Sequence, residues 1–331
     1  MQPEWVGRRV VVRRVLGVTA DPAQSARVDK SGQRFGDVLG DLLRLDADRA
    51  VIATNAGPVE VAVADITLAR LVQASTAAQL NLERIAAAGW QPAETEWIGG
   101  WLLRGSTGWT GRANSALPLK SPGMPMDEML QRVHRWYAER NLPPRIHVSL
   151  PARQLLDAFL ADTAFRKLED EADVGVWQCG PVTDVLVSRL DLLPSARIDG
   201  AAIEVAEVPS ADWLGTFREG SAPVGAVDIL TRHDRVAFLT VRDSDGAVLA
   251  IVRGVVDDGW LGITGLEVPP ERRGQGHSRT AMAAIVDWAR REHGAQRSYL
   301  QVEEHNEPAR QLYGSLGYHL HHTYRYWDRT R

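Results

Sequence analysis

The chain has 331 residues, which is enough for two or three domains, and its 44% hydrophobic and 24% charged content is typical of globular proteins that bury a core. Its formal net charge of −4 excludes a strong overall attraction to nucleic acid or to anionic membranes, so we expect neither as a partner. No signal-peptide pattern and no run of about 18 apolar residues occurs, so we expect a soluble cytoplasmic protein.

Residues 1–72 are predicted to form a small β-barrel. Runs rich in β-branched residues are separated by turn residues such as Ala56-Gly57-Pro58, at a spacing typical of small barrels. These runs lie at 8–16, 37–46, 50–55 and 58–63. The polar stretch 20–36 predicts a loop, and a helix is expected from Ala74 to a stop at Gly89. The basic residues of the first run lie on one strand and do not predict a nucleic-acid site.

Residues 73–199 are predicted to form a mixed sheet with flanking helices, because strand-like and helix-like patterns alternate. We expect two helices, one from Met126 or Asp127 to about Arg140 and one at 153–168. Strands are expected at 96–105, at 111–119, after Pro144, and at either 173–180 or 184–191. The single cysteine, Cys179, cannot form an internal disulfide, and we expect it to be buried and without a catalytic role.

Residues 200–331 repeat this order with clearer signals, so we expect the middle and last thirds to be diverged copies of one unit. A strand at 201–209 precedes a helix that Ser210 caps. Two hairpins within 235–268 turn at Asp245-Gly246 and Asp258-Gly259. The remaining elements are a helix ending near His293, a strand at 297–304, a helix at 307–317 and a strand at 318–327.

The segment EVPPERRGQGHS, residues 267–278, predicts an anion-binding loop. The chain leaves a strand, turns on Pro269-Pro270 and enters a helix through Gly274-Gln275-Gly276. A helix start offers backbone amides and a partial positive charge, and glycines leave room for a phosphate. Three arginines add formal charge, namely Arg272, Arg273 and Arg279. The simpler alternative is a tight turn with solvated arginines.

The spacing of the loop separates three classes of ligand. A Walker loop needs Gly-x-x-x-x-Gly-Lys followed by Ser or Thr, and no such run occurs. In a dinucleotide fingerprint the third glycine would be Arg279, and too few residues follow the helix to wind a Rossmann sheet. The dinucleotide class stays open as a minor alternative, and the third class is acyl-CoA, for which the sequence offers a resemblance.

Two blocks in the last third resemble the GNAT superfamily of N-acetyltransferases. RGQGHS, residues 273–278, resembles the family's Arg/Gln-x-x-Gly-x-Gly/Ala loop, with Ser278 where Gly or Ala is usual. NEPARQLYGSLGY, residues 306–318, resembles the family's Asn-x-x-Ala-x-x-x-Tyr segment. The blocks occur in the family's order, and the resemblance covers residues 201–327.

The whole chain resembles actinobacterial proteins in which an SH3-like barrel precedes a degenerate and then an intact GNAT lobe. The segments that carry this resemblance are 37–66, 99–119 and 136–145. It implies an α+β fold, a mixed β-sheet with tandem lobes, after a small all-β barrel. The implied domains are 1–72, 73–199 and 200–331. Some relatives have been described as N-acetylglutamate synthases.

The resemblance implies acetyl-CoA as cosubstrate, without a metal. The strands that contain Leu266 and Glu303 should splay apart, and the pantetheine arm should lie between them. Backbone groups of Leu266 and Val268 would bond this arm and the thioester. The remaining residues implied in coenzyme binding are Arg273, Gly274, Gln275, Gly276, His277, Ser278, Arg279, Asn306 and Tyr313.

The resemblance also places a general acid for the departing thiolate at Tyr313, although an amphipathic-helix tyrosine packed in the core is the alternative. Asn306 stands where a helix N-cap belongs, so capping is a second explanation for it. No motif assigns the general base. Candidates at the ends of the two strands are Glu267, Glu303 and Glu304.

The acceptor is predicted to be the primary amine of a small molecule, with the α-amine of glutamate suggested by the relatives alone. Arg112, Asn114 and Ser115 form a candidate carboxylate site, and a polar hairpin edge is the alternative. His319, His321 and His322 are expected to lie on the solvent face of a strand. The alternative functions are an acyl-CoA sensor or scaffold and a protein-lysine or aminoglycoside acetyltransferase. A homodimer is an alternative to a monomer.

Overall fold

The computed structural model describes residues 1–16, 27–28, 33–163, 176–193 and 200–329, which divide into two compact units, Met1–Ala74 and Ser75–Arg331. Most of the loop predicted at 20–36 lies outside the described residues, as does the end of the helix predicted at 153–168. None of the helices in the described ranges is long and apolar enough to span a membrane.

The first unit is an antiparallel sheet with the strand order β5-β4-β3-β1-β6, and β2 pairs with β3. Its strands are β1 (Arg9–Val15), β2 (Arg27–Val28), β3 (Arg34–Leu45), β4 (Arg49–Thr54), β5 (Gly57–Ala62) and β6 (Ile66–Leu71). Val10, Val12 and Ile52 form the centre of its core. The four predicted strands are confirmed, whereas β6 has no buried position and was not predicted. Closure into an SH3-like barrel stays a prediction.

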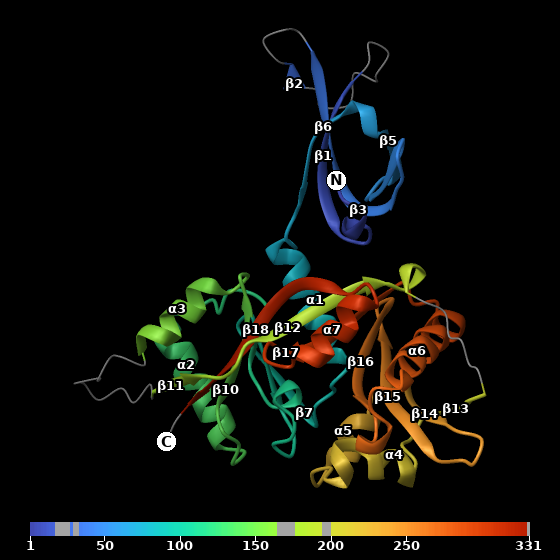
Figure 1. Cartoon of the computed structure of the whole chain (residues 1–331). Coiled ribbons are helices and arrows are strands. Elements are labelled where there is room, and N and C mark those ends of the chain that lie inside the picture. Colours follow the sequence, from blue (N-terminus) through green and yellow to red (C-terminus); the bar gives the residue numbers. More distant parts are fainter. Residues whose placement is uncertain (17–26, 29–32, 164–175, 194–199, 330–331) are drawn as a thin grey trace. The chain divides into compact units, whose positions relative to one another are not determined.

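The second unit is built on one large mixed sheet with the order β10-β18-β12-β17-β16-β15-β14-β13, and β11 also pairs with β18 (Figure 1). Its strands are β10 (Arg145–Leu150), β11 (Trp177–Cys179), β12 (Thr183–Arg189), β13 (Ala202–Ala206), β14 (Val236–Arg242), β15 (Val248–Asp257), β16 (Trp260–Glu267), β17 (Arg297–Glu303) and β18 (His319–Arg329). Of these neighbours, β16 and β17 run parallel and the others antiparallel.

The helices of the second unit cover the faces of this sheet. They are α1 (Thr76–Ala88), α2 (Met126–Ala138), α3 (Gln154–Thr163), α4 (Ala211–Thr216), α5 (Ala226–Thr231), α6 (His277–His293) and α7 (Glu307–Ser315). Helix α6 buries an apolar stripe that includes Ala281 and Ile285 against β14, β15 and β16. The approach is close at Gly254, where a Cβ atom would lie 2.7 Å from Ile285, so glycine is required for this packing.

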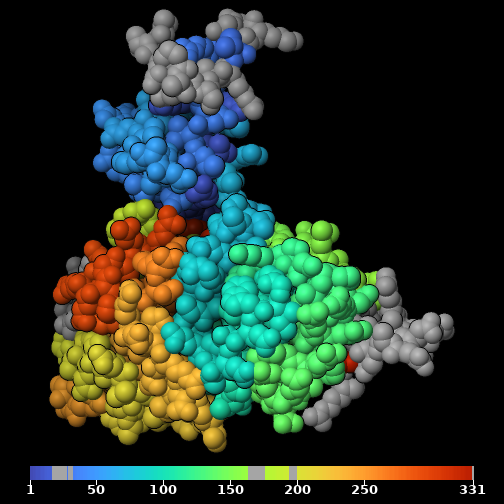
Figure 2. All heavy atoms as spheres, turned by 180° about the vertical axis from the view of Figure 1, so that it is seen from behind, coloured from blue at the N-terminus to red at the C-terminus, as the bar shows by residue number. Residues whose placement is uncertain are grey.

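Strands from both sides of residue 200 share the large sheet. β12 lies between β17 and β18, and β10 pairs with β18 (Figure 1). The division of residues 73–331 into two lobes at 199/200 therefore stays a prediction, and the main chain joins the two parts through continuous hydrogen bonding. Figure 2 shows the teal surface of the segment around α1 between the green of α2 and the yellow to orange of the residues that follow position 200.

Two predicted strands in the middle of the chain are wrong. Residues 111–119 form a 3-10 turn, η3 (Gly111–Ala113), and only a short strand, β9 (Leu117–Pro118). Residues 96–105 are not one strand but turn back on themselves, so that β7 (Glu94–Ile98) and β8 (Trp101–Gly105) form a hairpin. Its turn uses Gly99 at a φ of +56°, where a Cβ atom would lie 1.9 Å from the carbonyl oxygen of Pro122.

Cys179 is exposed, which contradicts the expectation that it is buried. It ends β11, a three-residue strand that pairs with β18. Trp177 at the other end of this strand is fully buried in the core, while the chain leaves the core at Cys179.

Candidate active site

The two parallel strands splay apart, as predicted. β16 and β17 are paired from Trp260 with Arg297 to Ile263 with Leu300. Beyond these residues both strands continue, β16 to Glu267 and β17 to Glu303, without pairing with each other. The ladder of β16 with β15 is also irregular there, and Gly265 has a φ of +59°. The facing edges of the two strands can therefore bond an extended ligand. Leu266 and Val268 lie at this edge, half-buried against the core.

The glycine loop forms the start of helix α6, as predicted. Gly274 and Gly276 have φ angles of 77° and 87°, which few residues other than glycine adopt. Gly276 is the N-cap and no side chain caps this helix, whereas Ser75, Ser210 and Asn306 cap helices α1, α4 and α7. A Cβ atom on either glycine would meet nothing within 4 Å. The open helix start can accept an anion such as a diphosphate.

The polar side chains of the loop make few and mostly exposed contacts. Arg273 donates from Nε to the Val268 carbonyl (3.2 Å) and lies 3.4 Å from Glu219. Arg279 donates to Oγ of Ser315 (2.6 Å). Arg272 pairs with Asp243 at 3.3 Å, Gln275 donates to the Glu271 carbonyl at 3.3 Å, and His277 lies 3.4 Å from Gln275. Exposed contacts of this kind are weak and leave the side chains free to rearrange around a ligand.

Tyr313 lies on α7 and packs against the core of the last third of the chain. Its ring stands edge-on to Tyr318, with 6.1 Å between the ring centres. Burial raises the pKa of Tyr313 to about 12. The phenol therefore keeps its proton at neutral pH and can donate a hydrogen bond. Asn306 is the N-cap of the same helix, and its Oδ1 accepts from the Ala309 amide (3.2 Å), so capping accounts for this residue.

Glu267 ends β16 and is the better placed of the predicted bases. Its Oε2 accepts from the Arg218 amide at 2.8 Å. Burial raises the pKa of its carboxyl group above the ordinary value. The contact is held by an unusual turn, because Arg218 and Glu219 have φ angles of 52° and 54°. Strained backbone at such a position is often associated with function.

Glu303 and Glu304 lie at the end of β17 and are exposed. The carboxylate of Glu303 is 3.1 Å from Nε2 of His305, and both side chains are mostly in solvent, at 55% and 72% exposed. Glu303 thus lies in solvent, whereas Glu267 is partly buried at the splayed end of β16.

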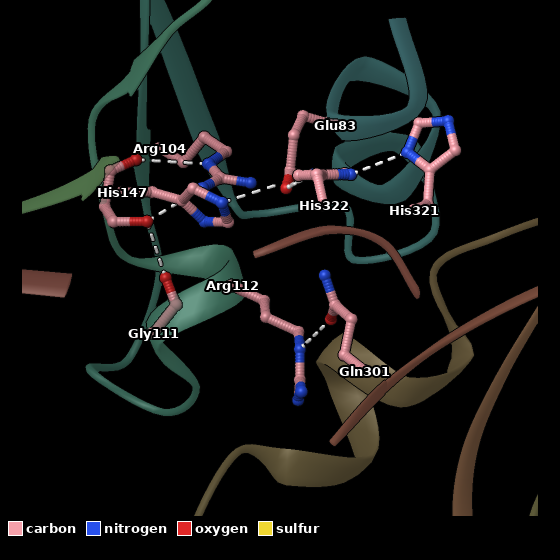
Figure 3. A network of polar contacts seen from close by, with 9 residues as sticks. Glu83, Arg104, Gly111, Arg112, His147, Gln301, His321 and His322 are labelled. Atoms are coloured by element: carbon pink, nitrogen blue, oxygen red, sulfur yellow. Dashed lines mark hydrogen bonds and ion pairs between the residues drawn. The ribbon is translucent and has the colours of Figure 1, made fainter. Parts of the chain in front are cut away.

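The predicted acceptor residues Arg112, Asn114 and Ser115 are close in sequence but differ in their contacts. Asn114 is buried and holds the loop before it, accepting from the amides of Ser106 (2.7 Å) and Gly108 (3.2 Å) and donating to two carbonyls. Ser115 is buried and bonds Arg104 and the Gly111 carbonyl, each at 2.7 Å. Arg112 instead reaches β17, where its Nε donates to Oε1 of Gln301 (Figure 3).

A buried cluster around Glu83 was not predicted. Glu83 is on α1 and 2% exposed, and Nε2 of His322 donates to its Oε1 at 2.7 Å. Nε2 of His147 is 3.1 Å from Oε2, and Nδ1 of His321 faces Nδ1 of His322 at 2.7 Å (Figure 3). Although burial alone would raise it, the two imidazoles hold the pKa of Glu83 well below its usual range.

The expectation that the three histidines of β18 face solvent is therefore wrong for His322, which is 3% exposed, while His319 and His321 are both half-buried. Helix α1 covers this face of the strand, and the pattern of β18 alone cannot show that. The available signal was on the helix, because Glu83 shares the buried face with Gln79 and Ala86 at helical spacing. No group of three or more His, Cys, Asp or Glu side chains in the described ranges could hold a metal ion.

A mixed sheet in which two parallel strands splay beside an uncapped glycine helix start is the architecture of the GNAT-type acetyltransferases. Comparison of the chain with known protein families gives the same class. The chain belongs to the family described as "Probable histone acetyltransferase Rv0428c C-terminal", which matches residues 76–327.

Two curated relatives support this assignment, and one solved structure shares the fold. The uncharacterized N-acetyltransferase YobR of Bacillus subtilis is 30% identical over 72% of this chain and 93% of its own length. The probable histone acetyltransferase Rv0428c of Mycobacterium tuberculosis is 28% identical over 88% of each chain. A GCN5-related N-acetyltransferase from Kribbella flavida covers 76% of this chain and 96% of its own, with a TM-score of 0.59 and 16% identity. The protein is an acetyltransferase, and enzymes of this class use acetyl-CoA as cosubstrate.

Proposed function

We propose that the protein transfers the acetyl group of acetyl-CoA directly to a primary amine, with residues 200–331 as the catalytic part. The observation that carries the proposal is the splay of β16 and β17 beside the open start of α6. The extended pantetheine arm fits between the strands, and the diphosphate fits at the helix start, where dipole and amides favour a negative charge.

The backbone near Leu266 and Val268 would bond the arm and polarise the thioester carbonyl. Amides aimed at the developing oxyanion are worth about 3 kcal/mol per donor. The Val268 carbonyl accepts from Arg273, and its second lone pair is available to a donor of the arm. The residues that would hold the phosphates are Arg273, Gly274, Gln275, Gly276, His277, Ser278 and Arg279.

Glu267 would act as general base and Tyr313 as hydrogen-bond donor to the leaving group. The amine loses a proton to Glu267, its nitrogen bonds the acetyl carbon, and the carbon–sulfur bond breaks to release coenzyme A. With the pKa of Tyr313 at about 12, full proton transfer to a thiolate of pKa near 8.5 would cost about 5 kcal/mol. Tyr313 therefore stabilises the thiolate by donating a hydrogen bond, and the thiolate takes its proton from water.

The role of the remaining chain is part of the same proposal. Residues 1–72 would form an SH3-like barrel and residues 73–199 a degenerate GNAT lobe that borders the acceptor. We propose a small-molecule amine as acceptor. Rv0428c is named a probable histone acetyltransferase, so a protein lysine is the principal competing acceptor.

The test measures binding and transfer separately. Calorimetry with acetyl-CoA should show saturable binding, and release of free thiol should follow the addition of an amine. The amines to be compared are the twenty L-amino acids, spermidine, an aminoglycoside and a lysine-containing histone peptide. Binding without turnover across the panel would indicate a coenzyme sensor, and absence of binding would contradict the whole proposal.

A further inference from the structure

The strands β16 and β17 begin to splay at a defined pair of residues. Ile263 and Leu300 are the last residues that pair, and their side chains are buried in the core that includes helix α6. Successive side chains of a strand point to opposite faces, so Thr264 and Gln301, the next residues along, point to the other face of the sheet. A group that contacts both strands at the splay from this face would contact these two side chains.

Each of these side chains contacts a different arginine. Nη1 of Arg253, on β15, lies 3.4 Å from Oγ1 of Thr264. Nε of Arg112, on η3, donates to Oε1 of Gln301 (Figure 3). Arg112 also hydrogen-bonds Tyr324 of β18. The two strands of the splay are thus held by two different guanidinium groups.

Both guanidinium groups lie against one indole ring, that of Trp90. Their central carbons are 5.4 Å (Arg112) and 5.0 Å (Arg253) from the ring centre. Cation–π attraction favours each contact, whereas the two like charges repel each other. If Gln301 moved toward β16, it would either break its bond with Arg112 or draw this arginine toward Arg253. The arrangement therefore opposes closure of the two strands.

Trp90 and Arg253 are fixed in place by their own contacts. Trp90 is 5% exposed and follows Gly89, the residue that ends helix α1. Nη2 of Arg253 donates to the Gly89 carbonyl at 3.2 Å, and its Nε donates to the Leu230 carbonyl at 2.8 Å. A cation at the C-terminal end of a helix is favourable, so the end of α1 and the arginine stabilise each other.

Buried hydrogen bonds fix the turn that carries Arg112. Arg104 is 2% exposed and donates from Nη2 to Oγ of Ser115 at 2.7 Å, and this hydroxyl donates to the Gly111 carbonyl at 2.7 Å (Figure 3). Arg112 is the next residue, and its guanidinium group is largely withdrawn from water. A cation in such a place is costly unless it is bonded, so Arg112 keeps its bonds to neighbouring side chains.

The open part of the splay needs such support when no ligand is bound. Beyond Leu300, the facing backbone groups of the two strands do not pair with each other. Buried backbone groups without partners are costly, so a closed form of the two strands would compete with the open form. A closed molecule cannot admit an extended ligand, and the affinity falls in proportion to the fraction of molecules that is open.

We propose that Trp90, Arg112 and Arg253 form a spacer that keeps β16 and β17 apart before acetyl-CoA binds, so that the gap for the pantetheine arm is preformed. This inference rests on the proposed function, because the arm of acetyl-CoA is what fills the gap. Trp90 and Arg112 are positioning residues, and both come from outside residues 200–331. The first half of the second unit thus prepares the coenzyme site of the second half.

The first test compares acetyl-CoA with 3′-phospho-ADP, which is the coenzyme without its pantetheine arm. Arg112→Met keeps the unbranched stem but removes the charge and the hydrogen bonds. In calorimetry it should bind acetyl-CoA at least about 10-fold more weakly than the wild type, because fewer molecules are open. Its affinity for 3′-phospho-ADP should change by less than about 3-fold, since the start of α6 is untouched. Equal losses for both ligands, or no loss, would overturn the inference.

Two control variants frame this result. Arg153→Met removes another half-buried arginine of the same half, whose Nε donates to the Pro118 carbonyl at 2.7 Å. It should melt at a lower temperature and bind both ligands like the wild type. Gly276→Val should weaken both ligands, because it alters the phosphate site that they share. A selective loss of acetyl-CoA affinity in Arg153→Met would contradict the inference, since any loss of stability would then act in the same way.

The second test uses the partner of Arg112. Gln301→Leu should show the same selective loss, and it carries the prediction if Arg112→Met does not fold. The double variant should lose no more affinity than the weaker-binding single variant, because the two side chains act through one contact. Gln301→Glu keeps an acceptor for the arginine and should bind acetyl-CoA within about 3-fold of the wild type. Additive losses in the double variant, or a 10-fold loss in Gln301→Glu, would overturn the inference.

The wild type separates the two proposals. If it binds acetyl-CoA and releases thiol while the Arg112 and Gln301 variants bind the coenzyme equally well, the spacer is wrong and the proposed function stands. If the wild type does not bind acetyl-CoA, both are wrong.

Discussion

At the scale of single residues, the environment of Glu267 gives the base assignment a direct test. The burial that raises its pKa makes the carboxylate a stronger base than an exposed glutamate, and the activity should fall as pH decreases through that raised pKa. Glu267→Gln should lower kcat by about 100-fold, because the amide cannot take the proton. Its side-chain oxygen can still accept from the Arg218 amide, so the turn should persist.

The same measurement on Glu303→Gln decides between the two candidate bases. Glu303 is exposed, and its replacement should change kcat little. If the Glu303 variant is the slower of the two, the base lies on β17 and the assignment to Glu267 is wrong. In the Glu267 variant, raising the pH should recover part of the rate, because an α-amine with a pKa near 8 then loses its proton to water.

Tyr313 gives a second prediction at this scale. Tyr313→Phe removes the hydroxyl group and keeps the ring that packs in the core. We expect kcat to fall by about 10-fold, from the loss of one hydrogen bond to the thiolate, with the dissociation constant of acetyl-CoA unchanged. An unchanged kcat would leave Tyr313 as a packing residue only.

The matched control is its neighbour Tyr318, whose hydroxyl lies 2.7 Å from Oγ of buried Ser298. Tyr318→Phe should cost about 1 kcal/mol of unfolding free energy, because a buried polar partner is left unpaired, while kcat stays the same. The two variants thus separate loss of catalysis from loss of stability in side chains of the same kind.

At the scale of elements, helix α6 allows a comparison of its two ends. Gly276 at the start and Gly294 at the end both have left-handed φ angles, 87° and 62°. Replacing either by valine should strain the backbone by about 1–3 kcal/mol. Gly276→Val should in addition weaken acetyl-CoA binding by at least about 10-fold, because its side chain would occupy the space for the diphosphate.

Calorimetry and thermal melting on both variants provide the check. Gly294→Val should melt at a lower temperature but bind acetyl-CoA like the wild type, since the phosphate site is at the other end of the helix. A similar loss of affinity in both variants would mean that the effect is only strain. It would then count against the assignment of the loop to the coenzyme.

The elements that the sequence predicts well are those defined by local signals. Hairpin turns at Asp258-Gly259, the cap at Ser210 and the apolar stripe of α6 each follow from residues a few positions apart. The strand predicted at 111–119 was wrong because the alternating polarity of this segment is typical of a strand. Its polar side chains in fact hold the preceding loop, as the bonds of Asn114 show.

The candidate site likewise has residues that the sequence predicts and residues that only the fold brings together. The glycine loop and Tyr313 lie in contiguous motifs and could be found from the sequence. Trp109 contacts Trp90 and Phe217 edge-on, and only the fold shows that these residues meet. Likewise, Glu83 and His322 are 239 positions apart in the chain. No local pattern encodes such a pairing.

At the scale of the whole molecule, the Glu83 cluster connects three elements of the second unit, namely α1, β10 and β18. The side chains that face one another are Glu83, His147, His321 and His322, with Tyr324 stacked on His147 at 4.0 Å. Burial lowers the pKa of His321 to about 3 and also lowers the pKa of His147. Both rings therefore resist protonation in the folded protein, while in the unfolded chain they take up a proton near pH 6.5.

This difference predicts that stability falls in mild acid. Below about pH 6.5 the unfolded chain binds protons that the folded protein excludes, so the free energy of unfolding decreases with falling pH. For His321 alone the loss between pH 7 and pH 5 is about 2 kcal/mol. Glu83 acts in the same direction at lower pH, because its folded pKa is depressed and its contribution is lost as it becomes protonated.

Denaturant unfolding of the full chain, followed by tryptophan fluorescence at pH 7, 6 and 5, provides the measurement. The free energy of unfolding of His321→Asn should depend less steeply on pH than that of the wild type. The variant lacks the imidazole that binds a proton only in the unfolded chain. His305→Asn is the matched control, since His305 is 72% exposed and lies outside the Glu83 cluster. Equal slopes for the wild type and His321→Asn would mean that the ring is protonated within the fold, and that the contact with His322 tolerates the charge.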